Sequence, residues 1–295
     1  MLKCTINRLR IIFFLLFALP LDAWAEPALG PQPVVLSTAS VRDRSLFEIG
    51  MVTGGAYGPD YPASDQSRFK FVVLPYVFYR GKVMRSDREG TRAKLLQSRY
   101  VNIEVSAAAS FASNSKDNAA RTGMPDLDYL LEIGPRLSVL LSTLGGLGKL
   151  RLFVPIRGVG STDFSNFHHR GFTLTPAFFA HIDNCIRPDW IYVSQLTANF
   201  ANRQLSAYFY DVAPEFATPT RPFYDAHGGY LGTDWFNGLA IPIGRRFRAF
   251  TGIQVWNHAG SANQASPLFR RQTNFTSLIG LGYTFYESRR PAKKD

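Results

Sequence analysis

The sequence predicts an all-β protein whose strands form a closed antiparallel transmembrane β-barrel of about twelve strands. Apolar and polar residues alternate with a period of two along most of the chain, which is typical of strands with one apolar and one polar face. The alternating segments are about ten to thirteen residues long, nearer the ~9 to 11 residues of a tilted membrane-spanning strand than the ~5 to 6 residues of most soluble strands. Short turns alternate with long polar connections, as expected where the two ends of a barrel face different compartments.

The composition excludes several other classes of protein. Residues of the AVILMFWYC set make up 46% of the 295 residues, which excludes an intrinsically disordered chain. Only 19% of the residues are charged, below the ~25% of typical soluble domains. The mean hydropathy is close to zero, unlike that of a polytopic helical membrane protein. Because no Pro- or Ser-rich linker follows residue 44, we expect one domain, the barrel, at residues 44–286.

The first 25 residues have the pattern of a secretory signal peptide. Basic residues precede an apolar run from 11 to 19, and Ala23-Trp24-Ala25 then supplies the small residues of a cleavage site. We expect cleavage after Ala25. An N-terminal membrane anchor is the alternative, but the apolar run is about half of the ~20 residues that a spanning helix needs.

Export changes the charge and cysteine arithmetic. Without the leader, which carries three basic residues and one acidic residue, the net charge falls from +11 to +9. Cys185 is then the only cysteine, so no intramolecular disulfide can form. The positive excess therefore points to anionic lipid or cell-wall polymer and not to nucleic acid. We expect a mobile lead-in at 26–43 and a basic tail at 287–295.

The strands follow one another along the whole expected domain. Short turns are expected at 144–148 and 244–245, and long polar loops at 112–125 and 217–226. The expected strands are 45–53, 69–79, 83–96, 100–111, 129–141, 150–157, 172–182, 190–200, 206–216, 229–243, 246–255 and 279–285.

The two faces of these strands differ in charge. The clean apolar faces carry no Lys, Arg, Asp or Glu, as lipid-facing surfaces require, since a Lys or Arg at the bilayer midplane costs ~2 to 4 kcal/mol. A soluble β-sandwich would alternate too, but it favours shorter strands. Aromatic residues near strand ends, Trp235 and Trp256 among them, suit interfacial girdles. The charges expected to face the lumen are Glu104, Glu132, Arg136, Arg151, Arg157, Arg246 and Arg248.

These lumen charges allow two interpretations. Pairing among them would fill a narrow barrel, because buried charges must be neutralised. If a water column remained, the arginine excess would favour anions. A filled lumen is the preferred interpretation, and a channel for small solutes is the alternative.

Candidate sites for chemistry are weak. We expect Gly54, Gly55 and Gly58 to serve a tight turn, because neither a helix start nor a lysine follows them as in a phosphate loop. Asp60 and Asp65, with Ser64 between them, lack the spacing of a calcium loop, and we expect a solvated turn there.

The histidines give no stronger signal. His168 and His169 beside Asp163 suggest zinc, but neighbouring residues of an extended chain point apart, so we expect ordinary loop histidines. His181 with Ser206 or Ser194 would be needed for a lipid hydrolase, and no spacing selects them. We therefore expect no catalytic residues, no metal site, no cofactor and no enzymatic activity.

Two segments carry a resemblance to a known family. The first is the run from Gly54 to Asp65 followed by Leu74-Pro75-Tyr76, and the second is Ala265-Ser266-Pro267-Leu268 ahead of the run from Gly280 to Phe285. In this order and spacing they resemble the MipA/OmpV family of outer-membrane proteins, the MltA-interacting proteins. The chain departs from the family at Ala63, where a glycine is usual, and in its tail. The residues that match are Gly58, Pro59, Tyr61, Ser64, Pro75, Ser266, Pro267, Leu268, Tyr283 and Phe285.

The resemblance implies a location and a role. It implies a barrel in the outer membrane of a Gram-negative cell, in contact with outer-membrane lipid. It implies a non-catalytic scaffold for peptidoglycan-remodelling enzymes, bringing a lytic transglycosylase to a penicillin-binding protein, or alternatively a porin-like protein.

Overall fold

The computed structural model describes residues 47–79, 84–87, 90–98, 100–145 and 147–288. The expected leader and lead-in, and residues 289–295 of the expected tail, lie outside this part of the chain. The described part is built almost entirely of strands, which confirms the all-β prediction. Within the same residues, no helix has the length and apolar character needed to cross a membrane.

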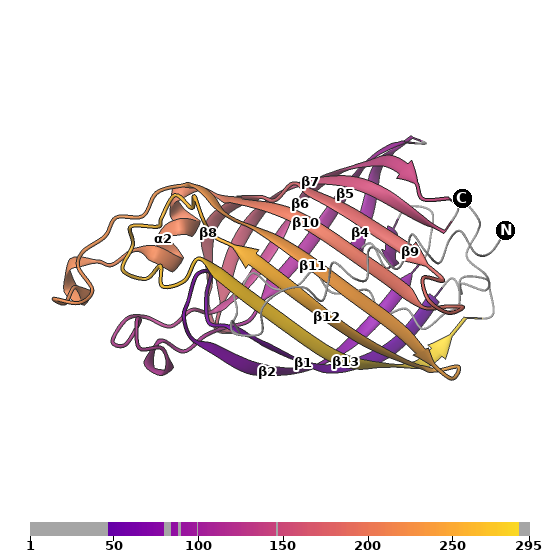
Figure 1. The fold of residues 1–295 in the computed structure, drawn as a ribbon, viewed down its shortest axis with the longest axis horizontal. Coiled ribbons are helices and arrows are strands. Elements are labelled where there is room, and N and C mark those ends of the chain that lie inside the picture. The colour runs from indigo at the N-terminus through magenta and orange to yellow at the C-terminus, as the bar shows by residue number, and fades with distance from the viewer. Residues whose placement is uncertain (1–46, 80–83, 88–89, 99, 146, 289–295) are drawn as a thin grey trace.

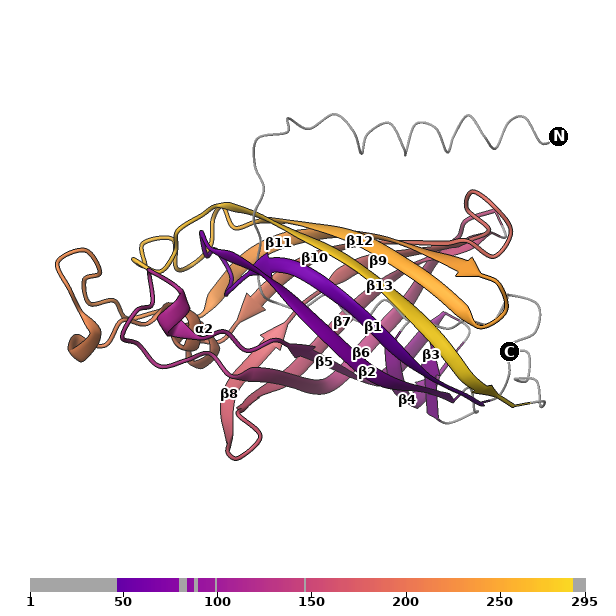
Figure 2. The ribbon, with the colours of Figure 1, turned by 90° about the horizontal axis from the view of Figure 1, so that it is seen from below.

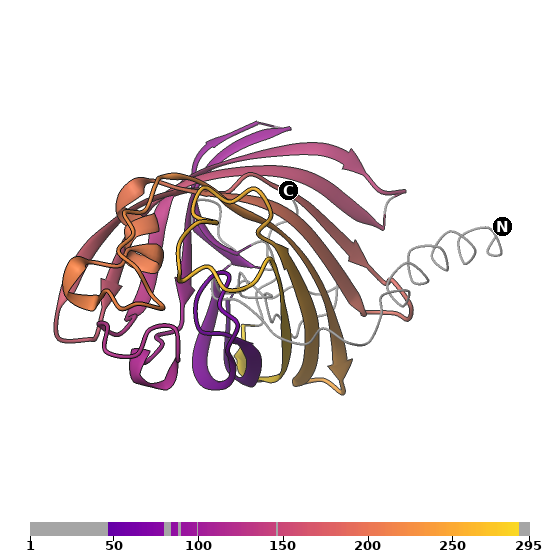
Figure 3. The ribbon, with the colours of Figure 1, turned by 60° about the vertical axis from the view of Figure 1, so that its left-hand side comes forward.

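Thirteen strands form one antiparallel sheet that curves around an interior (Figures 1 and 3). The sheet order is β2-β1-β13-β12-β11-β10-β8-β7-β6-β5-β4-β3, with β9 between β10 and β7. The strands are β1 (Phe47–Pro59), β2 (Ser67–Tyr79), β3 (Met84–Asp87), β4 (Gly90–Gln97), β5 (Val101–Ser110), β6 (Tyr129–Thr143), β7 (Gly148–Thr162), β8 (Phe167–Leu174), β9 (Ala177–Asp183), β10 (Ile191–Ala201), β11 (Gly229–Ile243), β12 (Phe247–Asn257) and β13 (Thr273–Glu287).

Two of these strands occupy a single position in the sheet. β8 and β9 both pair with β7 on one side and with β10 on the other. Thr175 and Pro176 interrupt them, and a proline cannot donate to the ladder. The thirteen strands therefore fill twelve positions. β2 and β3 form the two edges, and no ladder joins them among the described residues, so the expected closure of the barrel is not confirmed.

The expected number of about twelve strands equals the number of sheet positions only because two wrong strand assignments offset each other. The segment 206–216 is not a strand, because it contains helix α2 (Arg203–Tyr210) and a 3-10 turn at Pro214–Phe216. Asn202 caps the helix by accepting a hydrogen bond from the Leu205 backbone N–H, which competes with extended structure. The segment 83–96, expected as one strand, contains the paired strands β3 and β4.

Burial is inverted relative to a soluble protein. On β5 and β6 the charged residues are buried, whereas Val101, Leu131 and Ile133 are exposed, Ile133 by 64%. Phe172 of β8 and Phe178 of β9 are exposed in the same way. Large exposed apolar side chains on so many strands are unlike the surface of a soluble monomer. They match the lipid-facing band of a membrane barrel.

The two ends of the sheet differ, as Figures 1 and 2 show. One end, the short-turn end, carries the short connections between β6 and β7, between β9 and β10, and between β11 and β12. At the other end, α2 and the long connections pack into a layer that we call the loop cap. The loop cap comprises residues 60–66, 111–128, 202–228 and 258–272.

An apolar core holds the loop cap together. Tyr61, Leu205, Tyr210 and Leu268 are fully buried in it, although they come from three different connections. The Tyr61 hydroxyl donates to the Leu268 carbonyl oxygen at 2.9 Å, across 207 residues of sequence. The Tyr210 hydroxyl donates to the Pro62 carbonyl oxygen at 3.1 Å. Burial raises the pKa of both tyrosines, so both hydroxyls keep the protons that they donate.

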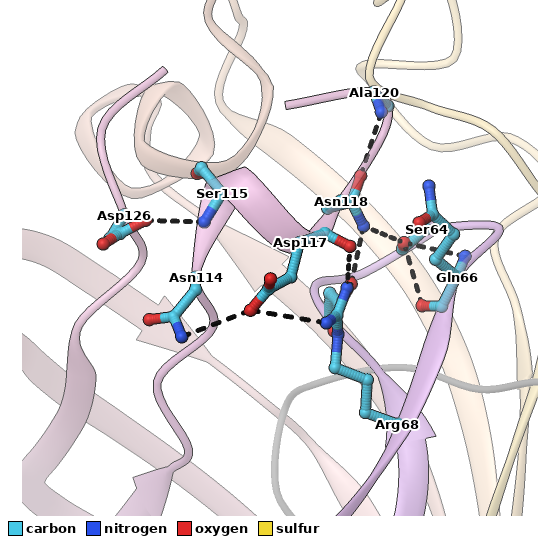
Figure 4. A network of polar contacts seen from close by, with 10 residues as sticks. Ser64, Gln66, Arg68, Asn114, Ser115, Asp117, Asn118, Ala120 and Asp126 are labelled. Atoms are coloured by element: carbon cyan, nitrogen blue, oxygen red, sulfur yellow. Dashed lines mark hydrogen bonds and ion pairs between the residues drawn. The ribbon is translucent and has the colours of Figure 1, made fainter. Parts of the chain in front are cut away.

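A polar network ties the β1–β2 turn to the β5–β6 connection (Figure 4). The Asn118 amide donates to Asp60 Oδ2 at 2.7 Å and to Ser64 Oγ at 3.2 Å. Arg68 Nε donates to Asp60 Oδ1 at 2.7 Å, and its guanidinium also contacts Asp117. At the loop-cap end, side chains therefore connect the edge strand β2 to the connection that follows β5.

Ala63 occupies a strained position in the loop cap. Its φ is +62°, in the left-handed region that costs a non-glycine residue roughly 1 to 2 kcal/mol. Its carbonyl oxygen accepts hydrogen bonds from the backbone N–H groups of Arg270 and Arg271 at 2.8 and 3.0 Å. These bonds join the β1–β2 turn to the β12–β13 connection, so the turn cannot relax without breaking them.

This geometry predicts opposite tolerances at position 63. Ala63→Gly should stay within about 1 kcal/mol of the parent free energy of unfolding, because the relief of strain offsets the lost methyl group and the added chain entropy. Ala63→Val should lower it by at least about 2 kcal/mol, since a β-branched residue is a severe outlier at positive φ. Urea unfolding of the refolded protein measures both, with the exposed Ala265→Val as the control. Equal midpoints for the two valine variants would contradict the assignment.

Candidate functional site

Two buried ion pairs lie on the inner face of the sheet. Glu104 of β5 and Arg136 of β6 are opposite each other in the ladder, and Arg136 Nη2 lies 2.7 Å from Glu104 Oε2. The two side chains are only 4% and 5% exposed. Arg157 Nη1 lies 3.5 Å from Glu132 Oε2. Each charge therefore has an opposite charge beside it, as burial requires.

Hydroxyl groups and an aromatic ring make further contacts with the charged side chains of the two ion pairs. Thr173 Oγ1 donates to Glu132 Oε2 at 3.2 Å, and Arg157 Nε donates to Ser106 Oγ at 3.0 Å. The Arg136 guanidinium lies 4.3 Å above the ring of Phe153, a cation–π contact that is stronger when desolvated. These contacts hold the side chains in place and leave little freedom to carry an ion along the interior.

The three other arginines expected in the lumen have different surroundings. Arg151 is half-buried and donates to Ser138 Oγ at 3.3 Å. Arg248 is buried and donates to the Asp189 carbonyl oxygen at 3.4 Å. Arg246 is exposed, because it belongs to the short turn before β12 begins at residue 247, and its guanidinium donates to the Tyr283 hydroxyl at 3.3 Å. The placement of Arg246 in the lumen was therefore wrong.

The interior also contains an apolar cluster that the sequence pattern did not predict. Its members lie on β7, β9, β10, β11 and β13, and Ile191, Val193 and Ala240 are the ones nearest the short-turn end. The rings of Phe153 and Phe179 pack with centroids 5.3 Å apart and planes tilted by 32°. This interior apolar cluster consists of Phe153, Phe179, Ile191, Val193, Phe236, Ala240 and Leu278.

A cavity of about 70 Å³ opens in the loop-cap half of the interior. Glu132 and Arg157 lie on one side of it, and Asp234 of β11 lies on another. The Asn199 amide donates to Asp234 Oδ2 at 2.8 Å, and the Gln254 amide donates to Asp234 Oδ1 at 2.7 Å. The cavity is thus lined by charges that are paired or held by hydrogen bonds. Asp234 was not among the predicted site residues, because its strand alternates poorly.

The residues that carry the family resemblance gather at the two ends of the sheet. Ser266 Oγ donates to the Tyr210 carbonyl oxygen at 2.8 Å, which fixes the β12–β13 connection on α2. The Tyr283 ring packs 4.6 Å from that of Phe247 and 5.2 Å from that of Phe285. Tyr61, Ser64, Ser266, Pro267 and Leu268 lie in the loop cap, Gly58 and Pro59 end β1, Pro75 lies in β2 opposite Met51, and Tyr283 and Phe285 lie near the end of β13.

Glycines 54, 55 and 58 lie within strand β1, so their expected place in a tight turn was wrong. At Gly54 a Cβ atom would meet the Ile279 carbonyl oxygen of β13 at 2.6 Å. At Gly55 it would meet the ring of Phe69. Close approach to the neighbouring strands explains these two glycines.

The residues considered for a lipid hydrolase do not come together. His181 faces the interior from β9, and its Nε2 lies 3.1 Å from Asp183 Oδ1. Ser194 is opposite Ala180 in the ladder and accepts a hydrogen bond from the exposed Trp235, so it lies on the other face of the sheet. Ser206 belongs to α2 in the loop cap, at the other end of the sheet.

No group of three or more His, Cys, Asp or Glu side chains in the described ranges could hold a metal ion. His168 and His169 are exposed residues of β8, so the expectation of loop histidines was wrong. Asp163 accepts hydrogen bonds from the backbone N–H groups of Ser165 and Asn166, and these bonds lower the pKa of Asp163. It therefore stabilises a turn.

Solved structures similar to this chain include outer-membrane proteins. The NanC porin is 9% identical, with 79% of this chain and 98% of that chain covered and a TM-score of 0.38. The CymD monoaromatic hydrocarbon channel is 9% identical, with coverages of 90% and 94% and a TM-score of 0.37. Outer membrane phospholipase A from Escherichia coli is 11% identical, with coverages of 80% and 92% and a TM-score of 0.31. At these scores the likeness carries no argument about function.

Comparison with curated proteins gives no match. The family model described as MltA-interacting protein MipA matches residues 49–285, which run from near the start of β1 to near the end of β13. This match covers most of the chain and confirms the family suggested by the motifs at the two ends of the sequence. The chain belongs to the MltA-interacting protein MipA family.

Proposed function

We propose that the chain is an outer-membrane β-barrel that acts as a non-catalytic scaffold for peptidoglycan-remodelling enzymes. Family membership supports this role, because the family is described by its interaction with the lytic transglycosylase MltA. A penicillin-binding protein is a second candidate partner. In this proposal a signal peptide cleaved after Ala25 exports the chain, residues 26–43 form a lead-in and residues 44–286 form the barrel.

The exposed apolar exterior supports the membrane location. Large apolar side chains such as Phe71, Ile133, Ile253 and Ile279 are more than half exposed and lie on the same outer face. In water this surface would aggregate, whereas in a bilayer it contacts lipid. Outer-membrane lipid is therefore the first partner that we propose.

The short-turn end supplies the surface for protein partners, and it is the observation that carries the scaffold role. In outer-membrane barrels the short turns face the periplasm, where peptidoglycan lies. This end exposes Leu144, Leu147 and Ile186 beside Arg187 and Arg245. Apolar residues flanked by arginine are typical of protein interfaces. We propose that this surface docks the transglycosylase.

A channel for small solutes is the second candidate function, and the polar cavity is the observation in its favour. The ion pairs, the interior apolar cluster and the loop cap oppose it, because each places packed side chains in the described interior or over its end. If the interior conducted, the buried arginines would favour anions.

Membrane insertion predicts that charge is costly on the outer face. Ile133→Arg should lower the folding free energy in bilayers by ~2 to 4 kcal/mol if residue 133 lies near the midplane. Phe164→Arg, in the exposed β7–β8 turn, should cost little. Refolding into vesicles, followed by the heat-dependent shift in gel migration, measures both. Equal folded fractions for the two variants would contradict insertion.

The scaffold role predicts loss of docking when the short-turn end is altered. Arg245→Glu with Arg246→Glu should weaken binding of purified MltA at least tenfold, because both arginines are exposed at this end. The control is Lys116→Glu, a charge reversal at an exposed site in the loop cap, which should bind as the parent does. Surface plasmon resonance with the immobilised barrel measures the affinity. Unchanged binding by the double variant would exclude this surface.

The filled interior predicts no discrete single-channel steps in planar bilayers. The refolded parent protein should give only a baseline current, because in this proposal the packed side chains of the interior and the loop cap obstruct the path of ions. A porin refolded by the same procedure is the positive control. Reproducible steps with anion preference would favour the channel over the scaffold.

A further inference from the structure

Two residues that line the cavity each carry a buried polar atom that has no hydrogen-bond partner within the described structure. These atoms are Nε1 of Trp256 and Oε1 of Gln254, on residues that are 1% and 5% exposed. Both residues lie on β12, two positions apart, and so point to the same side of the sheet. Leaving a buried donor or acceptor unsatisfied costs roughly 1 to 3 kcal/mol. Unpartnered atoms on two residues that line one cavity therefore favour a bound molecule there.

Trp256 is held firmly in this position. It was expected in an interfacial aromatic girdle, but its ring lies inside and stacks on the imidazole of His258, with centroids 5.4 Å apart and planes 11° from parallel. His258 Nδ1 in turn lies 2.9 Å from the Leu231 carbonyl oxygen. The indole N–H is thus a preorganised donor.

The polar atoms left without a partner in the lining residues favour a neutral ligand. Glu132 is paired with Arg157, and Arg136 is paired with Glu104. Both oxygens of Asp234 accept hydrogen bonds from amide groups, one of them from Gln254. The atoms left for a ligand are an uncharged donor and an uncharged acceptor. A hydroxyl group satisfies both kinds, because it donates one hydrogen bond and accepts others.

The rest of the lining suits a polyhydroxyl compound. The rings of Phe153 and Phe236 offer apolar surface to C–H groups. The hydroxyls of Thr173 and Thr197 also line the cavity. The volume of about 70 Å³ is several times the ~10 to 15 Å³ that one water needs by the same measure. A molecule between glycerol and a monosaccharide in size therefore fits.

We propose that the cavity beneath the loop cap binds a small uncharged polyhydroxyl ligand, which accepts a hydrogen bond from Trp256 Nε1 and donates one to Gln254 Oε1. This site is independent of the proposed scaffold role, which uses the opposite end of the sheet. Ordered water alone is the competing occupant.

Saturation-transfer NMR on the full chain, refolded in a detergent without a sugar headgroup, tests this site with D-glucose and glycerol as probes. At least one of them should bind saturably. Trp256→Phe, which keeps a ring but removes the N–H donor, should weaken binding at least tenfold. Trp235→Phe is the matched control, because Trp235 is 41% exposed on the outer face and its N–H donates to Ser194. It should bind as the parent does.

A second variant and two charged probes complete the test. If Trp256→Phe loses its heat-dependent gel shift, Thr197→Val takes its place, since it keeps the side-chain shape and removes a lining hydroxyl. It should also weaken binding. D-glucosamine and D-gluconate test the charge argument. Binding of D-glucosamine or D-gluconate tenfold tighter than that of D-glucose would overturn the proposal. So would the absence of saturable binding for both D-glucose and glycerol, or equal binding by the Trp256→Phe and Trp235→Phe variants.

Discussion

The pairing of buried charges on the inner face of the sheet constrains the rest of the structure. Glu104 lies opposite Arg136 in the β5–β6 ladder, and Arg157 of β7 reaches Glu132 of β6. A slip of one of these strands by one residue would move that strand's charges to the apolar exterior. A slip of two would keep them inside but separate the partners, and a buried unpaired charge is costly. The ion pairs therefore select one register where the apolar faces alone would accept several.

Period-two alternation predicted the sheet because each face of a strand meets a single environment. It failed where another local signal was stronger. Asn202 caps a helix whose buried residues, Leu205 and Phe209, are four positions apart, the spacing of a helix face. Asn202 is a recognisable N-cap residue in the sequence, but the aromatic residues that follow it favoured the prediction of a strand. Closure of the barrel depends on contacts between the edge strands β2 and β3, and no local pattern of residues reports such contacts.

The candidate site was predictable to a similar extent. The inward position of buried charges such as Glu132 could be predicted, because the polar face of a membrane-spanning strand must point to the interior of the barrel. Trp256 shares the parity of Gln254 and could have been assigned inward, but its size suggested an interfacial ring. Asp234 was missed in a strand that alternates poorly. Contacts such as that between Tyr61 and Leu268 join segments 207 residues apart, so only the folded chain reveals them.

The arrangement of the interior bears on both proposed functions. The interior apolar cluster borders the cavity through Phe153 and Phe236, while the loop cap packs its own core at the end with the long connections. A cavity beside a packed cluster and beneath the loop cap suits a ligand that is held better than one that passes through. The residues proposed for docking lie in the short turns and none of them lines the cavity. The proposed docking surface and the proposed ligand site can therefore be altered separately by substitution.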